Sequence, residues 1–449
     1  MKLRRRLQLL SFLSLAVGRL LAGPDTVALC VITGDQHSAY DHMAQFVGLV
    51  DQLKAENPGL PVAVLLDGDT LEYGNALARR SHGAADFAQF AALARRGPTV
   101  LNLGNHEPEF YDLAETVQRL SATGVQVVSN ISNHATGQPF APASCTLTLG
   151  AEKFVVVGLT TDHLSTYRVA VRPSLDLANP VVWARAHFPT LLAAAPYPIV
   201  LSHAGLGPDR EMLPLVPDGT LFAGAHDHLR FVKPVGRTVY FHSGAWNESV
   251  SLAWLVREAG GGLRWRVEQR RIPDGPGAAD VAAAIAAARK EFSAPEDSVV
   301  VGRLPQQLSP PEAARFAVRS LRDAAGVEAA FIGNTTFGGG LPAGEITRLE
   351  FDACIRFDGG IFTTEVDGAR LAQLLAEANE NPDTPFARRK GAFNFAEGPT
   401  VVDPARRYRI ATNDWGAKNT AKMFGEPALV WQEIPGLKLK AAVQGQFAR

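Results

Sequence analysis

Five short apolar runs in the first half of the chain have the pattern of buried β-strands. They cover residues 27–33, 62–66, 99–103, 198–202 and 221–225. Stretches with a helical pattern, such as residues 41–57 and 86–96, lie between them. Strands that alternate with helices indicate crossover units and a largely parallel or mixed sheet. The sequence therefore predicts an α/β fold.

Each of the five runs is followed by, or ends in, polar residues that can bind a metal. These are Asp35 and His37, Asp69, Asn105 and His106, His203, and finally His226 and His228. Sites in open α/β sheets lie beyond the carboxyl ends of the strands, which is where all of these residues fall. In extended backbone, residues i and i+2 project to the same side. We therefore expect Asp35 to converge with His37, and His226 with His228.

The donor types in these clusters are carboxylate, amide and imidazole, with no cysteine among them. Oxygen and nitrogen donors in this mixture suit Zn, Mn, Fe or Co. They are too many for one four-coordinate zinc, so two ions that share a bridging carboxylate are the simpler interpretation. A metal pair of this kind is suited to in-line displacement at phosphorus.

Each residue taken alone also has a purely structural interpretation. Asp69 can cap the following helix, and Asn105 beside Gly104 can be a turn residue. His203 alone is better explained as a buried core histidine than as a ligand. His226 and His228 can form a surface pair. The metal hypothesis rests on all of these residues together.

The order Asp-x-His, Gly-Asp, Gly-Asn-His-Glu, His and His-x-His resembles that of the calcineurin-like metallophosphoesterases. The resemblance implies a four-layer αββα domain with two divalent metal ions. It assigns one ion to Asp35, His37, Asp69 and His228, and the other to Asp69, Asn105, His203 and His226. Asp69 bridges the two ions in this assignment.

The same resemblance makes His106 the catalytic imidazole, which stabilises charge on the phosphoryl group or on its leaving oxygen. The family has an Asp three residues after this histidine, where this chain has Glu109. Glutamate can accept the same imidazole N–H through a longer arm, so we expect the chemistry to be retained.

The second half of the chain resembles the C-terminal domain of the 5'-nucleotidases, in the same order along the chain. The likeness is carried by residues 341–347, by Val366-Asp367-Gly368 and by residues 412–415. It implies a smaller α/β (α+β) domain that recognises substrate. Phe393 and Trp415 match the two aromatics that clamp the base in that family, although both can instead be core aromatics.

Two departures bear on the substrate. The family's arginine-bearing turn is replaced by Asn334-Thr335-Thr336-Phe337-Gly338, and its Gly-Gly-Asp by Lys418-Asn419-Thr420-Ala421. Arg356 and the run 388–390 are candidates to replace the lost arginine. A site without those polar contacts cannot discriminate a nucleoside in the usual way. Phosphoester hydrolysis is therefore better supported than nucleotide specificity.

The boundaries follow from the change of pattern along the chain. Residues 1–23 resemble a signal peptide, with a basic start, an apolar stretch and small residues at the end, and Arg4-Arg5-Arg6 leaves a twin-arginine route open. An uncleaved amphipathic arm is the alternative. We predict a metallophosphoesterase domain over 24–272, a linker helix within 273–294 and the substrate domain over 295–449. Export to the periplasm or the cell exterior follows from the first segment.

Overall composition limits the classes of molecule that the protein can bind. The 44 basic and 45 acidic residues give a formal net charge of −1, which argues against a nucleic-acid polymer as ligand. Cys30, Cys145 and Cys354 are too few for a disulfide framework. No segment after the N-terminus approaches the length of a membrane span. The expected partner is a small phosphoester, and the oligomeric state stays open.

The sequence thus predicts a dinuclear metal-dependent phosphoester hydrolase that resembles the 5'-nucleotidases and UDP-sugar hydrolases. One alternative is a metallophosphoesterase for a different ester, such as a cyclic nucleotide, a sugar phosphate or a sulfur analogue. A second is a binding protein that kept its metals and lost turnover. The complete ligand set and His106 argue against this second alternative.

Overall fold

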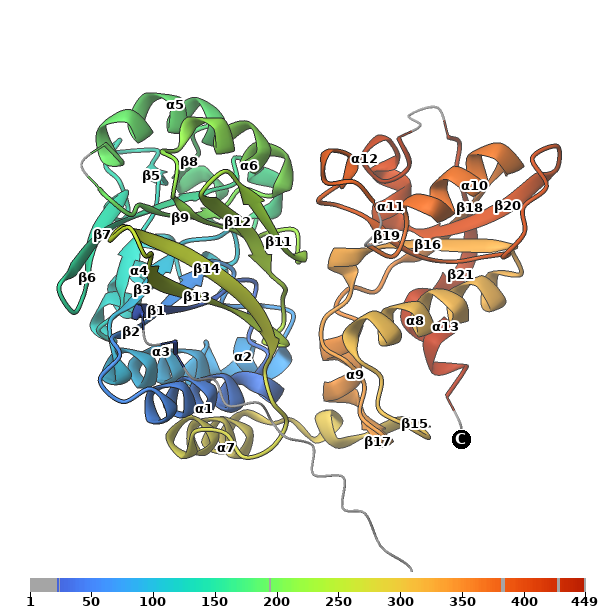
Figure 1. Cartoon of the computed structure of the whole chain (residues 1–449). Helices are drawn as coiled ribbons and strands as arrows, with labels where there is room; N and C mark the ends of the chain where they lie inside the picture. The colour runs from blue at the N-terminus through green and yellow to red at the C-terminus, as the bar shows by residue number, and fades with distance from the viewer. Residues whose placement is uncertain (1–21, 24, 194, 381–383, 426–428, 448–449) are drawn as a thin grey trace, which may run out of the picture.

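The computed structural model describes residues 22–23, 25–193, 195–380, 384–425 and 429–447. The signal-like segment 1–23 lies outside the described residues except for its last two positions. The chain forms two lobes, one from β1 to α7 and the other from residue 295 to α13 (Figure 1). No helix within the described part of the chain combines the length and the apolarity that a membrane crossing requires.

The first lobe contains two six-stranded sheets. The strands of the first sheet lie in the order β14 (Leu263–Arg271), β13 (Ser249–Arg257), β1 (Thr26–Thr33), β2 (Val62–Asp67), β3 (Thr99–Asn102) and β4 (Gln126–Val128). Strands β1 to β4 are parallel, whereas β13 pairs antiparallel with β1 and with β14. The parallel strands are apolar on both faces, which is why their sequences are continuously hydrophobic.

The second sheet has the order β11 (Arg230–Val235), β12 (Thr238–Ser243), β10 (Leu221–Gly224), β9 (Ile199–His203), β7 (Glu152–Thr160) and β6 (Ser144–Leu149). Its four central strands are parallel, and β11 and β6 are antiparallel edges. A small two-stranded sheet joins β5 (Ser132–Asn133) to β8 (Leu175–Asp176).

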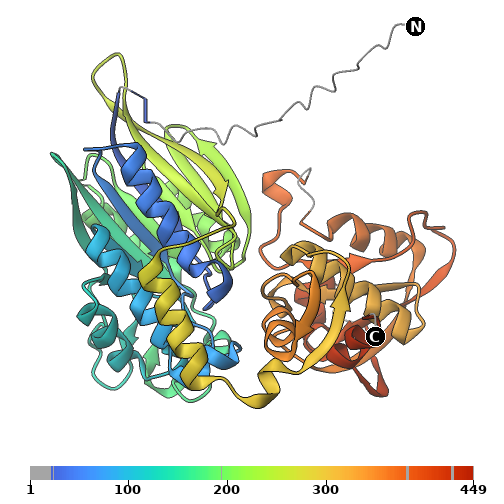
Figure 2. The same ribbon diagram turned by 90° about the horizontal axis from the view of Figure 1, so that it is seen from below.

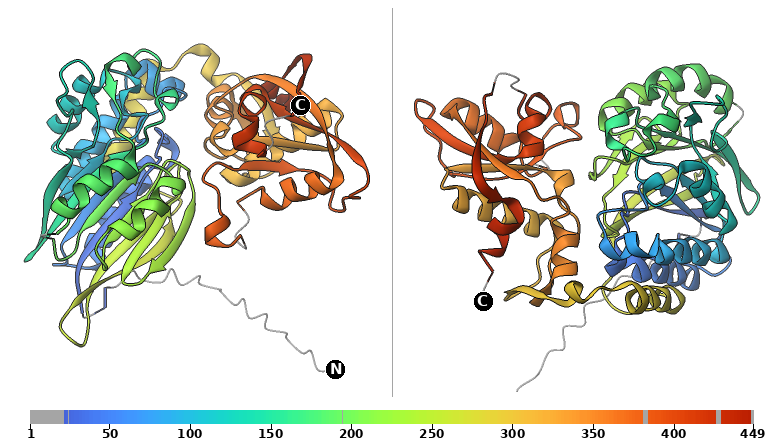
Figure 3. Two further views of the ribbon diagram at one scale, coloured as in Figure 1. Left: turned by 90° about the horizontal axis from the view of Figure 1, so that it is seen from above. Right: turned by 180° about the vertical axis from the view of Figure 1, so that it is seen from behind.

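The two sheets face each other between two helix layers, which gives four layers (Figure 3). Alternate residues of one strand enter different cores, because strand side chains alternate between faces. Cys30 and Ile32 of β1 pack between the sheets, whereas Leu29 and Val31 pack against helices. The first sheet is covered by α1 (Tyr40–Glu56), α3 (Ala84–Arg96), α4 (Leu113–Ala122) and α7 (Ala279–Phe292). The second is covered by α5 (Pro180–Leu191) and α6 (Leu206–Met212).

Helix α7 connects the two lobes, and it also belongs to the helix layer of the first lobe. Its buried residues Val281, Ile285 and Ala288 join the core that contains α1 and α3. It lies beside those helices in the view from below (Figure 2). The alanine-rich sequence allows this close packing, because alanine adds little bulk between helices and favours the helical state.

The second lobe is a three-layer α/β unit. Its five-stranded mixed sheet has the order β19 (Asn394–Glu397), β16 (Ala329–Gly333), β20 (Arg407–Asn413), β18 (Gly360–Asp367) and β21 (Gln432–Lys438). One face packs on α8 (Pro310–Ala325), α9 (Arg348–Cys354) and α13 (Leu439–Gln444). The other packs on α10 (Gly368–Glu377) and α12 (Thr420–Phe424). A separate pair joins β15 (Val300–Leu304) to β17 (Gly344–Thr347). The predicted fold class is confirmed.

The lobes touch through side chains of the second lobe that pack on the first. Phe386 packs against Phe231 and Tyr240, with ring centroids 5.8 and 5.9 Å apart. Arg210 of α6 donates to the carbonyl oxygens of Phe386 and Arg389.

The three cysteines are free thiols, with Cys30 and Cys354 buried and Cys145 half-buried.

Candidate metal centre

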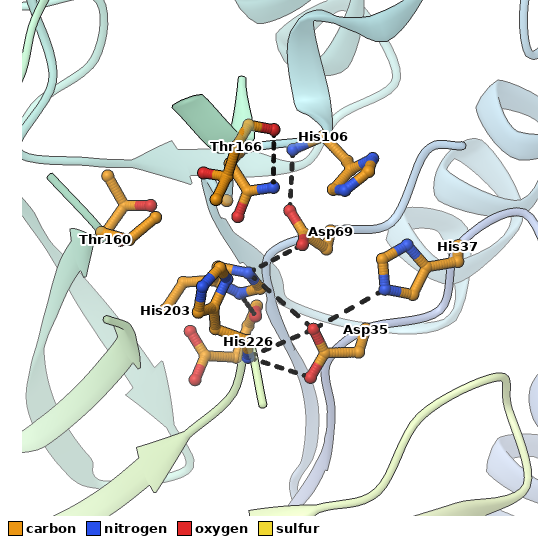
Figure 4. A network of polar contacts seen from close by, with 12 residues as sticks. Asp35, His37, Asp69, His106, Thr160, Thr166, His203 and His226 are labelled. Atoms are coloured by element: carbon orange, nitrogen blue, oxygen red, sulfur yellow. Dashed lines mark hydrogen bonds and ion pairs between the residues drawn. The ribbon is translucent and has the colours of Figure 1, made fainter. Parts of the chain in front are cut away.

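The predicted ligands occupy loops at the carboxyl ends of strands from both sheets. The first sheet supplies Asp35 and His37 after β1, Asp69 after β2 and Asn105 after β3. The second supplies His203 at the end of β9, and His226 and His228 after β10. The carboxyl ends of strands from both sheets therefore meet at one site (Figure 4).

The backbone reason for this convergence differs from the expected one. Asp35, His37, Asp69, His226 and His228 all have positive φ, between 48° and 77°. They therefore lie in the left-handed region, and the expectation of extended backbone at these positions was wrong. L-residues rarely adopt this conformation, and where they do the strain clusters at functional sites.

The donor atoms form two groups that share no histidine. Asp35, His37 and His228 each offer one atom within 4.8 Å of the others, and so do Asp69, His203 and His226. His226 and His228 are thus divided between the groups and do not converge as a pair. The four histidines are divided as in the assignment that the family resemblance implied, with Asp69 only in the second of these two groups. A third group of His37, Asp69 and His106 links the two.

Two carboxylates lie at the centre of the site. Asp35 Oδ1 lies 3.8 Å from Nε2 of His37, of His203 and of His228. Asp69 Oδ2 lies 2.9 Å from His203 Nε2, and its Oδ1 accepts the backbone N–H of His106 at 2.8 Å. His37 Nε2 and His228 Nε2 face each other at 3.0 Å.

The unpartnered atoms of the site fit metal ions. His203 donates Nδ1–H to the carbonyl of Asp67 at 2.7 Å, and its Nε2 faces the carboxylate of Asp69 at 2.9 Å. The buried Nδ1 of His226 has no hydrogen-bond partner. Asn105 donates its amide to the carbonyl of Thr166 at 3.4 Å, and its buried Oδ1 has none. Buried polar atoms without partners are costly, and a metal ion satisfies them. The residues present therefore fit divalent ions.

The electrostatics of three of the four proposed histidine ligands agree with this assignment. At the fourth, the carboxylate of Asp69 outweighs burial and raises the pKa of His203 well above its usual value. Burial lowers the pKa of His37 and His226 well below the usual range, and that of His228 to about 4. These imidazoles are neutral at physiological pH, as metal ligands must be. Burial also raises the pKa of Asp35 well above its usual range. A buried carboxylate of this kind is stabilised by a nearby cation.

His106 lies beside the two donor groups, on the loop after β3. Its Nδ1 is 2.9 Å from Glu109 Oε1, which is the contact expected from the family pattern despite the longer side chain. Residues Glu107–Glu109 form a short 3-10 helix that carries Glu109 back to the ring. Burial alone would lower the pKa of His106, but the carboxylates of Asp69 and Glu109 raise it to about 9.

Residues 29–230 match the family model described as calcineurin-like phosphoesterase. The chain contains a calcineurin-like phosphoesterase domain. This confirms the predicted family, and with it the prediction that the protein is a phosphohydrolase. The family uses divalent metal ions, in agreement with the donor groups of the site. No curated protein is a significant match to the whole sequence.

Solved structures extend the likeness of fold beyond the phosphoesterase domain. The 5'-nucleotidase precursor from Thermus thermophilus has a TM-score of 0.61 and 18% identity, over 93% of this chain and 95% of that chain. The sulfate thiohydrolase SoxB from the same organism has a TM-score of 0.62 and 17% identity, over 94% and 95%. The 5'-nucleotidase from Candida albicans has a TM-score of 0.60 and 12% identity, over 93% and 97%. At these identities the likeness is one of fold.

A cavity of about 360 Å³ lies beside the phosphoesterase site, between the lobes. Its first-lobe wall includes His228 and Trp246, and its second-lobe wall includes Phe393 and Phe395. Trp415 is not among the lining residues. It lies on α11 (Asp414–Lys418), 37% exposed, and packs near Gly333. Only one of the two predicted clamp aromatics therefore faces this cavity.

The two candidates to replace the lost arginine have different surroundings. Arg356 is buried and reaches the phosphoesterase domain, where its guanidinium contacts Glu72 and lies over the ring of Trp246 at 4.6 Å. In the run 388–390, the carbonyl of Arg389 accepts from Arg210, and Lys390 pairs with Glu377 at 2.6 Å on the surface.

Three further residues shape the site and were not predicted. Glu107 accepts from the backbone N–H groups of Asp69, Thr70 and Gly104, which fixes the loop that carries Asp69. Trp246 stacks on His37 with ring centroids 4.5 Å apart. Glu72 lies near His37 and His106. The signal for Glu107 and Glu72 was their nearness in sequence to Asn105 and Asp69, whereas Trp246 follows a different strand and had none.

Proposed function

We propose that the protein is a dinuclear metal-dependent phosphoester hydrolase. The observation that carries this proposal is the pair of donor groups around Asp35 and Asp69, with separate histidines in each. In this scheme Asp35, His37, Asp69 and His228 hold one ion, and Asp69, Asn105, His203 and His226 hold the other. Bound divalent ions activate water for attack on phosphorus and neutralise charge on the phosphoryl oxygens.

The protein's own groups position and protonate the substrate. Glu109 engages Nδ1 of His106, which leaves Nε2 to stabilise the phosphoryl oxygens or to donate to the leaving oxygen. The raised pKa of His106 favours the protonated ring that this role needs. The cavity lined by Phe393 and Trp246 gives room for an organic leaving group next to the ligand His228.

The proposed substrate is a small phosphoester with a planar group. Phe393 presents an aromatic wall in this cavity, whereas Trp415, the second clamp residue implied by the resemblance, lies outside it. The polar contacts that recognise ribose are replaced in this sequence, so an ordinary nucleoside monophosphate is disfavoured. Esters of sulfur are the second candidate, since a sulfate thiohydrolase shares the fold. We further propose that the protein is exported, on the evidence of residues 1–23.

Asp69 gives the decisive test, because it alone is shared between the proposed ions. Asp69→Ala is expected to lose both ions and the phosphatase activity, as measured by elemental analysis and by hydrolysis of phosphomonoesters, diesters, pyrophosphates and thiosulfate esters. Asp274→Ala is the control, since the side chain of Asp274 is 94% exposed. Full metal content and full rate in Asp69→Ala would contradict the proposal.

A further inference from the structure

Arg356 of the second lobe enters the metal site of the first. It lies two residues after the end of α9, and its side chain is only 3% exposed. The guanidinium lies over the ring of Trp246 and its Nη2 contacts Glu72 Oε2. The aromatic face and the carboxylate form a slot that fits a planar guanidinium. A lysine ammonium does not fill this slot in the same way.

Glu72 connects this arginine to the histidines of the site. It lies three residues after Asp69, and its side chain is 4% exposed. Its Oε2 lies 3.2 Å from Nδ1 of His37 and 3.5 Å from Nδ1 of His106. Its Oε1 accepts the backbone N–H of Gly74 at 2.6 Å. One carboxylate thus faces a proposed ligand, the proposed catalytic histidine and a cation from the other lobe.

A carboxylate in this position can orient a histidine that binds a metal ion. A histidine that binds metal through Nε2 generally donates Nδ1–H to a carboxylate, which fixes the ring and raises its basicity. Such a carboxylate is costly to bury unless a cation balances it. Glu72 is in position to orient His37 in this way, and Arg356 supplies the balancing charge.

We propose that Glu72 and Arg356 form a positioning pair between the lobes. Arg356 holds Glu72 in place, and Glu72 orients the rings of His37 and His106 through their Nδ1 atoms. Docking of the second lobe therefore sets the geometry of a site whose ligands all belong to the first. Arg356 acts through Glu72 in this scheme and does not bind the phosphoryl group itself. The role of this positioning pair rests on the proposed function only for its kinetic measurements.

The test compares Glu72→Gln, Arg356→Met and the double variant by metal affinity and by steady-state kinetics. Glu72→Gln is expected to weaken Co²⁺ affinity about 10- to 100-fold and to change the visible absorption spectrum of the bound ion. Arg356→Met is expected to lower kcat for an aryl phosphate about tenfold or more, with KM nearly unchanged. The double variant should be no worse than the more severe single variant, because both remove one unit.

Three further measurements separate this role from general stability. Arg289→Met removes a half-exposed arginine that lines a pocket together with Arg356 and pairs with Asp41 at 3.4 Å, and it should leave Co²⁺ affinity unchanged. Guanidinium chloride at low concentration should restore part of the kcat of Arg356→Ala, because the ion fits the slot between Trp246 and Glu72. Arg356→Lys should have a kcat between those of the wild type and Arg356→Met.

Three results would overturn the proposal. One is Co²⁺ affinity in Glu72→Gln equal to that of the wild type. Another is additive loss in the double variant, which would mean that the two residues act separately. The third is a rise in KM alone for Arg356→Met, which would mean that the arginine binds substrate directly. If the wild type hydrolyses no ester, the proposed function fails, but the Co²⁺ measurements still decide the role of Glu72.

Discussion

His106 illustrates how much of the chemistry depends on single side chains. Its backbone N–H donates to Asp69, and its ring contacts Glu109, so the proposed acid is held both by the proposed bridging ligand and by a second carboxylate. Its nearness to His37 and Asp69 also makes it a geometric candidate for a ligand. The contact with Glu109 occupies Nδ1 and favours the catalytic role.

The His106→Ala variant distinguishes these two roles. We expect it to keep its full metal content while kcat falls about 10²- to 10⁴-fold, the usual loss when a positioned acid or base is removed. Elemental analysis and steady-state kinetics on one preparation measure both quantities. Glu109→Gln serves as the companion variant and should keep the metal with a smaller loss of kcat. Loss of metal from His106→Ala would make this residue a ligand.

The candidate ligands of the site could be proposed from sequence, but their backbone geometry could not. Asp35 and His37 were identified from their place after a buried strand and from a family pattern. The expectation that extended backbone aligns them failed, because φ is 50° at Asp35 and 48° at His37. Left-handed aspartate and histidine are uncommon and depend on contacts from elsewhere, such as the Trp246 N–H, which donates to the carbonyl of Asp35 at 2.8 Å. Local sequence does not contain that information.

At the scale of elements, continuous apolar runs predicted the strands that carry the site. Strands β1, β2, β3, β9 and β10 all occur where the runs indicated. Their division between two sheets could not be inferred from the runs, because a strand buried on both faces has the same pattern in either sheet. The hydrogen-bond register decides it, and that depends on long-range pairing. The family resemblance supplied the four-layer arrangement instead.

Helix α7 offers a test of how the connection between the lobes is anchored. Asp280 in its first turn bonds Arg95 at 2.9 Å and Arg96 at 3.0 Å, both at the end of α3. These bonds lower the pKa of Asp280 from 3.8 to about 2. A depressed folded-state pKa means that the ionised group stabilises the fold above pH 3.8 and loses this effect as the pH falls toward 2.

Asp280→Asn should therefore lower the free energy of unfolding at neutral pH. The side chain is 38% exposed, so solvent screening limits the expected loss to about 0.5–1 kcal/mol. The difference from the wild type should shrink once the pH falls below about 4. Urea unfolding at several pH values measures it, with Asp274→Asn as an exposed control. A difference that stays constant down to about pH 3 would show that the carboxylate charge is not the cause.

At the scale of the whole molecule, the contacts between the lobes were the least predictable feature. Arg356 was a candidate from sequence only because the family's arginine is absent. Its partners Glu72 and Trp246 lie far from it in the chain and belong to the other lobe. Phe386, which packs on Phe231 and Tyr240, carried no signal at all. Such contacts depend on how two separately folded units dock, and no local pattern encodes docking.

The cavity between the lobes gives the last prediction, which concerns the substrate. Phe393 faces Phe395 at 5.2 Å and lines the cavity next to His228, so it can stack on a planar leaving group. Phe393→Ala is expected to raise KM for an aryl phosphate about 5- to 150-fold, the equivalent of losing ~1–3 kcal/mol of stacking. KM for a small aliphatic phosphate should hardly change, because that substrate has no ring to stack.

The same kinetic experiment also uses the variant Trp415→Ala and the substrate AMP. The resemblance implies that Trp415 also clamps the substrate, whereas its place outside the cavity favours a smaller rise in KM than for Phe393→Ala. AMP should be hydrolysed more slowly than the aryl phosphate, since the turn and the Gly-Gly-Asp that hold the nucleotide in the family are replaced here. Trp183→Ala, on the outer helix α5, is the aromatic control. A strong preference for AMP, with KM unchanged in Phe393→Ala and Trp415→Ala, would place substrate recognition outside this cavity.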